Sequence, residues 1–187
     1  LNASDTWANA DKLIIWNGGY TTYGLYQPAT GDAYWMAEGI GWVRSNMAAA
    51  AVVSLNREDA VWFKTGTGGT STNVIVSGEV FDDDTYDVTV SSGFNLITYP
   101  YSSSINLTNL TVTGATADII FADADQIIVW DGGYTAYGLY DDTANNRTFW
   151  MADGIGWVRS NMAAPANVTL DLGKGFWYKS PDAADKD

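Results

Sequence analysis

Two aromatic clusters with the same spacing are the residues of this chain whose chemistry is best suited to holding a ligand. Each cluster is one Trp followed by three Tyr, and the members are Trp16, Tyr20, Tyr23 and Tyr26, then Trp130, Tyr134, Tyr137 and Tyr140. Flat apolar rings with polar tips can stack against a sugar ring, so these eight residues are candidate saccharide contacts. The same residue types also pack across strands in the core of a sheet, which is the simpler interpretation.

Strand geometry limits how the tyrosines of one cluster can cooperate. Successive side chains of a strand point to opposite faces, so Tyr20 and Tyr26 would share one face while Tyr23 lies on the other. The second cluster repeats this spacing. One flat binding surface would therefore need a bulge in the strand.

Carboxylates form the second candidate group. Asp82, Asp83 and Asp84, followed by Asp87, are the densest acidic group, and oxygen ligands on a turn suit calcium. The glycine and the terminal glutamate of an EF-hand loop are missing. A solvated turn explains the same residues, because Asp is common in turns. Calcium stays open as the only cofactor, and otherwise we expect none.

The chain offers few side chains that could act as catalytic acids or bases. The chain has no His and no Cys, which removes imidazole and thiol chemistry and the zinc sites that need those ligands. Glycoside hydrolysis requires two carboxylates across a cleft, and Glu38 with Glu58 is the only nearby pair of glutamates. The second copy of the repeat described below does not preserve this pair. We therefore expect a protein that is not an enzyme.

Arg44 and Arg159 stand in an identical stretch, Gly-Trp-Val-Arg-Ser-Asn-Met, each a few residues after an acidic residue, Glu38 or Asp153. Arginine is enriched at protein interfaces, so both are candidate assembly contacts. An exposed ion pair within one chain is the alternative, and it would contribute little to stability.

The charge of the chain excludes two classes of partner. Asp and Glu total 22 against 9 Lys and Arg, which gives a net charge of −13. This charge opposes binding to nucleic acid or to an anionic membrane surface. The chain begins with Leu1 rather than Met, and no apolar run has the length of a membrane-spanning helix. We expect an extracellular or cell-surface protein, either processed or part of a longer chain, without membrane insertion.

The elements that must position these residues occur twice. Residues 8–65 return as residues 122–180, with more than half of the paired positions identical. We predict a first repeat module over residues 1–65, a β-rich spacer over 66–121 that completes the sheets, and a second module over 122–187. Duplication on this scale is typical of repeat architectures, which work by stacking or multivalency.

The pattern within each copy predicts an all-β fold, an antiparallel sandwich or a barrel-like sheet. Asn17-Gly18-Gly19 and Asp131-Gly132-Gly133 are turn residues between apolar strand segments, which is a hairpin signal. Further strands are expected at residues 34–37, 61–65, 74–80, 86–90, 94–99 and 176–180. Residues 106–112 are expected to form a strand or a short helical turn, and residues 45–51 a single helical turn. Turn signals every eight to twelve residues favour this fold class.

Part of this order resembles a known repeat. Gly93-Phe94-Asn95-Leu96-Ile97, then Gln126 to Gly132, then Gly173 to Tyr178 are similar to a β-rich repeat of secreted bacterial surface proteins. The resemblance covers about half of the chain through short motifs. It implies extracellular display and names no ligand.

The two copies differ in what flanks them, and this difference predicts assembly. The first copy lacks the Gly-Phe-Asn-Leu-Ile strand that precedes the second, and the second has only residues 181–187 after it. Unfinished sheets recruit strands from neighbours, so we predict a structural subunit that joins copies of itself into a filament or surface layer. The predicted assembly contacts are Leu1, Trp7, Arg44, Arg159, Phe176, Trp177 and Tyr178. The alternative is a bivalent module that binds extracellular polysaccharide through the duplicated aromatic clusters.

Overall fold

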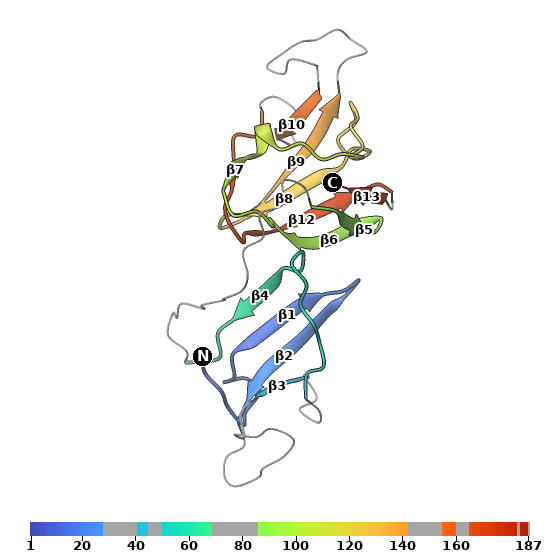
Figure 1. Cartoon of the computed structure of the whole chain (residues 1–187). Helices are drawn as coiled ribbons and strands as arrows, with labels where there is room; N and C mark the ends of the chain where they lie inside the picture. The colour runs from blue at the N-terminus through green and yellow to red at the C-terminus, as the bar shows by residue number, and fades with distance from the viewer. Residues whose placement is uncertain are drawn as a thin grey trace. The chain divides into compact units, whose positions relative to one another are not determined.

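The computed structural model describes residues 1–27, 41–44, 50–68, 86–141, 155–159, 165–182 and 184–186. These residues form antiparallel β-sheets with one short 3₁₀ helix and no α-helix, so the predicted all-β fold is confirmed. The chain divides into two compact units (Figure 1). Unit 1 contains Leu1–Asn56 and Val61–Glu79, and unit 2 contains Arg57–Ala60 and Val80–Asp187.

Unit 1 is built on a four-stranded sheet in the order β3-β2-β1-β4. The strands are β1 (Lys12–Trp16), β2 (Tyr20–Tyr26), β3 (Gly41–Arg44) and β4 (Val61–Lys64). β1 and β2 form the expected hairpin, in which Trp16 lies opposite Tyr20. The turn between these strands requires a residue in the left-handed backbone conformation, and Gly18 adopts it with φ 67°.

Unit 2 is built on a five-stranded sheet in the order β10-β9-β8-β12-β6. The strands are β6 (Gly93–Thr98), β8 (Gln126–Trp130), β9 (Tyr134–Asp141), β10 (Ile155–Arg159) and β12 (Gly175–Ser180). In this sheet β10, β9, β8 and β12 correspond in order to β3, β2, β1 and β4 of unit 1. Trp130 lies opposite Tyr134, as Trp16 lies opposite Tyr20 in the first hairpin. The fifth strand, β6, has no counterpart among the described residues of unit 1.

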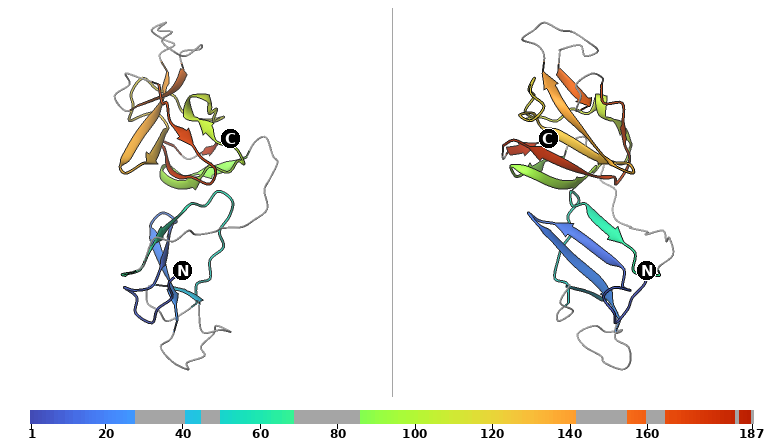
Figure 2. Two further views of the ribbon diagram at one scale, coloured as in Figure 1. Left: turned by 90° about the vertical axis from the view of Figure 1, so that its left-hand side faces the viewer. Right: turned by 180° about the vertical axis from the view of Figure 1, so that it is seen from behind.

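A second layer covers one face of the unit 2 sheet and gives it a sandwich-like arrangement (Figure 2). This layer contains β5 (Val88–Val90) paired with β13 (Ala184–Lys186), and β7 (Ile105–Asn106) paired with β11 (Thr169–Leu170). The 3₁₀ helix η1 (Leu107–Asn109) follows β7, and the side chain of Asn106 caps it. Leu107 and Leu170 are fully buried against Ile127 and Phe176 of the sheet. Of the expected element at residues 106–112, Asn106 ends a strand and Leu107–Asn109 form a short helical turn, whereas residues 110–112 form neither.

Three predicted elements cannot be compared with the structure. The strands expected at residues 34–37 and 74–80 lie outside the described residues, as does most of the helical turn expected at residues 45–51. The strands expected at 61–65, 86–90, 94–99 and 176–180 correspond to β4, β5, β6 and β12, with ends shifted by up to two residues.

A buried carboxylate closes unit 1. Asp11 is almost fully buried, and its two oxygens accept hydrogen bonds from the backbone N–H of Asn2 at 2.6 Å and of Gly66 at 2.9 Å. The carboxylate thus joins the first residues of the chain to the segment that follows β4. Gly66 must be glycine here, because a Cβ at this position would overlap the carbonyl of Asn9.

Unit 2 repeats this closure with a different set of donors. Asp125 is fully buried and accepts the N–H of Thr116 at 2.7 Å. Pro181 stands where unit 1 has Gly66 and offers no N–H. Tyr178, which replaces Phe63, places its hydroxyl beside the Asp125 carboxylate; burial, and then this carboxylate, raise the pKa of Tyr178. The two units therefore correspond in structure from Asn2 and Thr116 onward, whereas the repeated sequence begins only at residues 8 and 122.

Candidate functional site

The outer edge of β4 distinguishes unit 1 from unit 2. β4 is the last strand of its sheet and pairs with β1, from Lys12 opposite Lys64 to Ile15 opposite Val61. Its counterpart β12 lies inside its sheet, between β8 and β6. The same strand is thus an edge in one unit and an interior strand in the other.

The outer strands β3, β10 and β6 are each bridged at one position by a neighbouring stretch of chain. β3 is bridged by Ala50 opposite Val43, and β10 by Pro165 opposite Val158. β6 is bridged at Ile97 by Asp59, and the N–H of Thr98 donates to the carbonyl of Glu58 at 2.9 Å. Within the described residues, no bridge of this kind lies on β4. Uncovered edges are the places where sheets accept further strands.

Two apolar residues that form part of the unit 2 core have exposed counterparts in unit 1. Leu55 is 50% exposed whereas its counterpart Leu170 is fully buried, and Val61 is 37% exposed against 6% for Phe176. In unit 2 the second layer covers these positions, and Leu170 also pairs with Ile105 of β7. The described residues of unit 1 contain no equivalent layer. Leu55 and Val61 are thus more exposed than their counterparts in unit 2, beside the outermost described strand of the unit 1 sheet.

The predicted assembly contacts differ in exposure and in their place in the fold. Leu1 is exposed, but the ring of Trp7 lies against Gly24 of β2, where a Cβ would come within 2.5 Å of it. The backbones of Arg44 and Arg159 end β3 and β10, and their side chains lie outside the described part of the structure.

Three predicted assembly contacts lie inside the unit 2 sheet. Phe176, Trp177 and Tyr178 are buried in β12, which β8 and β6 flank on both sides. The sequence predicted this strand as a contact because its motif closes the chain. The motif does not reveal that β6, some eighty residues earlier, already pairs with it.

The structure brings together two of the four aromatic residues of each cluster. The Trp16 and Tyr20 rings meet edge to face with their centroids 4.9 Å apart, and the Trp130 and Tyr134 rings do so at 4.8 Å. Both pairs lie at hairpin tips. Tyr20, Trp130 and Tyr134 are exposed, and Trp16 is half-buried. The two units thus display the same aromatic pair.

The remaining cluster members lie elsewhere. Tyr23 and Tyr137 are buried on the opposite sheet face, and Tyr137 belongs to the unit 2 core. Their burial conflicts with a role as ligand contacts. Tyr26 and Tyr140 are half-buried at the far end of the strand, about six residues or roughly 20 Å from the tip.

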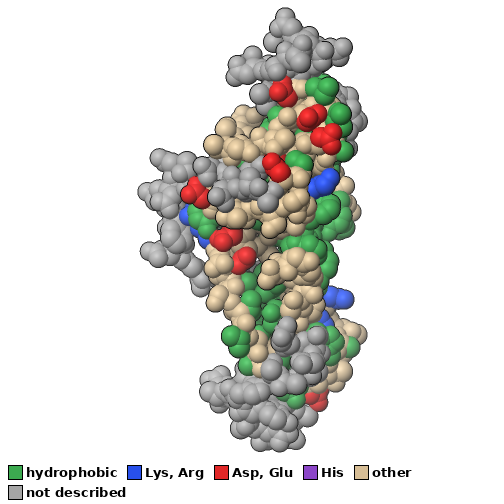
Figure 3. Space-filling model, turned by 90° about the vertical axis from the view of Figure 1, so that its right-hand side faces the viewer, with side chains coloured by type: hydrophobic (Ala, Val, Ile, Leu, Met, Phe, Trp, Pro, Cys, Tyr) green, Lys and Arg blue, Asp and Glu red, His purple; other side chains and the backbone are tan. Residues whose placement is uncertain are grey.

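One further exposed aromatic residue shares the face of the Trp130–Tyr134 pair. Phe94 of β6 meets Trp177 edge to face at 6.1 Å, and Trp177 is opposite Ile128, two residues from Trp130 in β8. Phe94 was not among the residues that the sequence predicted as contacts. Strand alternation would have placed it on the same face as Leu96, which is also the face of Trp130. Figure 3 shows hydrophobic side chains reaching one surface of the molecule, with acidic side chains in several separate groups.

Acidic residues do not gather into a site in the part of the chain that is described. Asp87 is exposed, whereas Asp82, Asp83 and Asp84 lie outside the described residues, and no three acidic side chains come together among those that are described. The Glu38 and Glu58 pair cannot be compared, because Glu38 also lies outside. The predicted calcium site therefore stays a prediction.

Glu58 has a structural partner. Its carboxylate accepts a hydrogen bond from the hydroxyl of Tyr86 at 2.6 Å, and this bond, followed by burial, raises the pKa of Tyr86 to about 12. The Arg57 guanidinium lies 4.4 Å from the Tyr86 ring and donates to the carbonyl of Pro100 at 3.1 Å. These contacts fasten Arg57–Ala60 to unit 2.

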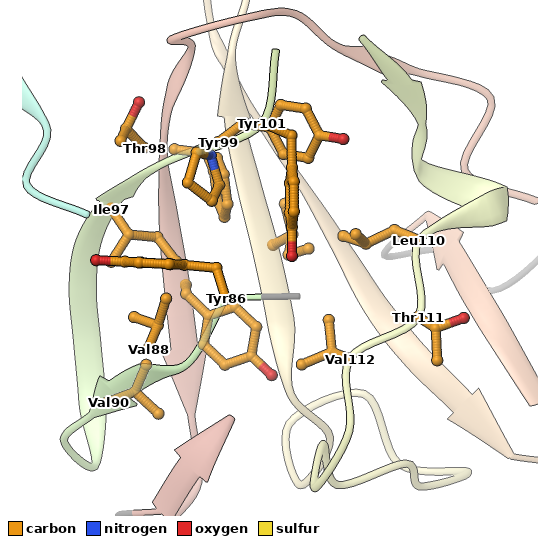
Figure 4. A pocket seen from close by; sticks show the side chains of 14 residues that line it. Tyr86, Val88, Val90, Ile97, Thr98, Tyr99, Tyr101, Leu110, Thr111 and Val112 are labelled. Carbon is orange, nitrogen blue, oxygen red and sulfur yellow. The ribbon is translucent and has the colours of Figure 1, made fainter. Parts of the chain in front are cut away.

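Unit 2 also contains a cavity of about 80 Å³ between its two layers (Figure 4). Val88, Val90 and Ile97 line one side, and Leu110 and Val112 line the other. None of the lining residues carries a charge. The volume is well below the several hundred Å³ of ordinary ligand pockets, and the lining offers no acid–base pair.

No helix among the described residues is long and apolar enough to cross a membrane. Comparisons of the chain with protein families, with curated proteins and with solved structures give no match. Function is therefore inferred from the geometry of this chain.

Proposed function

We propose that this protein is an extracellular structural subunit that assembles with copies of itself through the open edge of unit 1. One observation carries the proposal: among the described residues β4 is the last strand of its sheet, while the corresponding β12 is flanked by β6. The extracellular setting is supported by the resemblance of the Gly93 to Ile97 and Gly173 to Tyr178 motifs to repeats of secreted surface proteins.

Strand addition explains how such an edge would bind. An edge strand presents unpaired backbone N–H and C=O groups, and a strand added beside it supplies their hydrogen bonds. The exposed apolar residues Val61 and Leu55 add buried area to the same contact. A contact between two β4 edges would close as a symmetric dimer, whereas a contact between β4 and a different edge would propagate into a filament.

Sedimentation and negative-stain microscopy over a range of concentrations test the proposal. The unmodified chain should associate, and Val61→Lys should weaken association by placing a charge on the open strand. Ile119→Lys is the matched control, because Ile119 is an exposed β-branched residue of unit 2 and the charge change is identical. A monomer at every concentration, or equal effects of the two substitutions, would refute assembly through β4.

A second candidate function is bivalent binding of extracellular polysaccharide. It is favoured by the edge-to-face Trp–Tyr pair that both hairpin tips display. Two linked sites gain avidity without new contacts, so loss of either pair should weaken binding to a multivalent glycan.

Polysaccharide pull-down and a glycan array test this candidate. Tyr20→Ala combined with Tyr134→Ala should abolish binding if the tips are the sites. Ile119→Ala combined with Ile120→Ala removes two exposed apolar side chains elsewhere and should leave binding unchanged. The absence of saccharide binding in the unmodified chain would dismiss this function.

A further inference from the structure

We propose that Asn109 of the folded protein is an acceptor for an asparagine-linked oligosaccharide. The chain contains several Asn-x-Ser/Thr sequences, which begin at Asn2, Asn106, Asn109, Asn146 and Asn167. This sequence is the glycosylation acceptor of extracellular proteins, and it must be presented at the surface. The proposal therefore rests on the extracellular setting of the proposed function. Asn146 lies outside the described residues, and the structure distinguishes the other four.

The acceptor sequence at Asn109 is accessible. The side chain of Asn109 is exposed and makes no hydrogen bond to any residue that the structure describes. Asn109 ends η1, and Leu110 after it has an extended backbone with φ −76° and ψ 121°. Thr111 is also exposed, and residues 110–112 belong to no strand. The two residues that define an acceptor, Asn and Thr, thus both reach the surface here.

The amide of Asn106, three residues earlier, is engaged at both ends. Its Oδ1 accepts the N–H of Thr108 at 3.0 Å and the Thr108 hydroxyl at 2.7 Å, which caps η1. Its Nδ2 donates to Oδ1 of Asn167 at 2.9 Å. Leu107, the middle residue of this sequence, is fully buried in the core. An enzyme that binds this sequence must therefore break the cap and remove Leu107 from the core.

The acceptor sequence at Asn2 is held by the buried carboxylate of unit 1. The N–H of Asn2 donates to the Asp11 carboxylate at 2.6 Å, and its carbonyl accepts the N–H of Asp11 at 2.8 Å. Its Nδ2 donates to the carbonyl of Asn9 at 2.7 Å. Both the backbone and the side chain of Asn2 must be released before this sequence can react.

Asn167 is exposed, but its sequence runs into the second layer of unit 2. Its Oδ1 accepts the bond from Asn106, and the carbonyl of Val168 accepts the N–H of Leu107 at 2.8 Å. The sequence ends in β11, which pairs with β7. Among the described acceptor sequences, only the one at Asn109 combines an amide free of hydrogen bonds with a stretch outside the strands.

The reaction joins Nδ2 of Asn109 to the anomeric carbon of a sugar. The co-substrate is a lipid-linked oligosaccharide diphosphate. The C–N bond forms as the bond between the anomeric carbon and the diphosphate oxygen breaks. Nδ2 loses one proton, and the lipid diphosphate leaves with the electron pair of the broken bond. The oligosaccharide would extend into solvent from η1, because Asn109 is exposed there.

Transfer to the folded full chain tests the proposal. The chain is incubated with a lipid-linked oligosaccharide and an oligosaccharyltransferase that recognises Asn-x-Ser/Thr, and mass spectrometry of proteolytic fragments gives the occupancy of each site. Synthetic peptides of the same acceptor sequences measure the transfer that each allows without a fold. Asn109 should react in the chain at a rate similar to that of its peptide. Asn106 should react at least about tenfold more slowly in the chain than in its peptide, because only locally opened molecules present it.

Substitutions within the two neighbouring acceptor sequences give matched controls. Thr111→Val keeps the shape of the side chain and the Asn109 amide but removes the hydroxyl, so it should abolish transfer to Asn109, whereas Thr111→Ser should retain it. Asn109→Gln should also abolish transfer and should leave thermal unfolding unchanged, because its amide holds no described residue. Asn106→Gln should lower the unfolding temperature, because it removes the cap of η1.

The outcomes separate this proposal from the proposed assembly. Absence of transfer to Asn109 in the folded chain overturns it, as does transfer that is slowed equally at Asn109 and at Asn106 relative to their peptides. Either result leaves assembly untouched, because sedimentation of the unglycosylated chain measures association independently. A chain that accepts the oligosaccharide at Asn109 but sediments as a monomer refutes the proposed assembly and supports the acceptor site.

Discussion

A single buried carboxylate serves the same purpose in both units with different partners. Asp11 binds the N–H groups of Asn2 and Gly66, while Asp125 binds that of Thr116 and lies beside the hydroxyl of Tyr178. The exchange of Gly66 for Pro181 removes a backbone donor, and the exchange of Phe63 for Tyr178 adds a hydroxyl. Among the described residues the Tyr178 hydroxyl has no hydrogen-bond partner, so it does not replace the backbone donor that Pro181 removes.

The hydroxyl of Tyr178 gives a prediction. Tyr178→Phe should change the free energy of unfolding of unit 2 by less than about 1 kcal/mol, because the hydroxyl that it removes is buried without a hydrogen-bond partner among the described residues. Chemical denaturation of this variant and of the unmodified chain measures the difference. A loss of about 1 to 3 kcal/mol would mean that the hydroxyl donates to Asp125.

The bond between Tyr86 and Glu58 predicts a pH dependence. The pKa of Tyr86 is raised from 10.0 to about 12 in the folded protein, so the folded state keeps this proton longer than the unfolded chain. Stability from this bond is therefore fully present below pH 10 and is lost as the pH rises from 10 to about 12.

Unfolding measured against pH in the unmodified chain and in Tyr86→Phe checks this dependence. The difference in the free energy of unfolding between the two should be constant below pH 10 and should shrink above it. Tyr178, whose pKa is also raised, is present in both chains and cancels from the comparison. A difference that stays constant through pH 12 would contradict the assignment.

For strands and turns, the sequence predicts pairing between segments that are neighbours in the chain, but it does not predict pairing between distant segments. The two hairpins were predictable because Asn17-Gly18-Gly19 and its counterpart lie between apolar strand segments. Strand alternation likewise anticipated that Tyr23 would face away from Tyr20. The pairing of β13 with β5 and of β11 with β7 was not predictable, because strands of two or three residues have no periodicity and their partners lie far away in sequence.

The packing of Trp7 on β2 gives a prediction for one such distant contact. Gly24→Ala should destabilise unit 1 by about 1 to 3 kcal/mol, because the new Cβ would lie 2.5 Å from the Trp7 ring. Gly19→Ala is the control, since no atom lies within 4 Å of a Cβ at Gly19. Thermal unfolding of the two variants compares them directly. Equal effects would mean that the ring does not hold the strand.

For the whole molecule, the duplication predicted two corresponding sheets but not how the middle of the chain is used. Residues 86–112, which the sequence assigned to a spacer, supply β6 of the unit 2 sheet and β5, β7 and η1 of its second layer. Composition cannot show this, because the segment reads as ordinary strands and turns. The asymmetry between the units, and with it the candidate site, emerges only when β4 and β12 are compared in place.

The same asymmetry predicts that the two units differ in stability. Unit 2 encloses a core between two layers, whereas the described residues of unit 1 leave Leu55 and Val61 exposed on one sheet. Calorimetry of the monomeric chain should therefore show two transitions, with unit 1 unfolding first, because less apolar surface is buried there.

Matched substitutions assign these transitions. Ile127→Ala removes a fully buried side chain of unit 2 and should move only the upper transition, with a cost of about 2 to 5 kcal/mol. Leu13→Ala, at the corresponding and only half-buried position of unit 1, should move only the lower transition and by less. A single transition shifted by both substitutions would mean that the units unfold together.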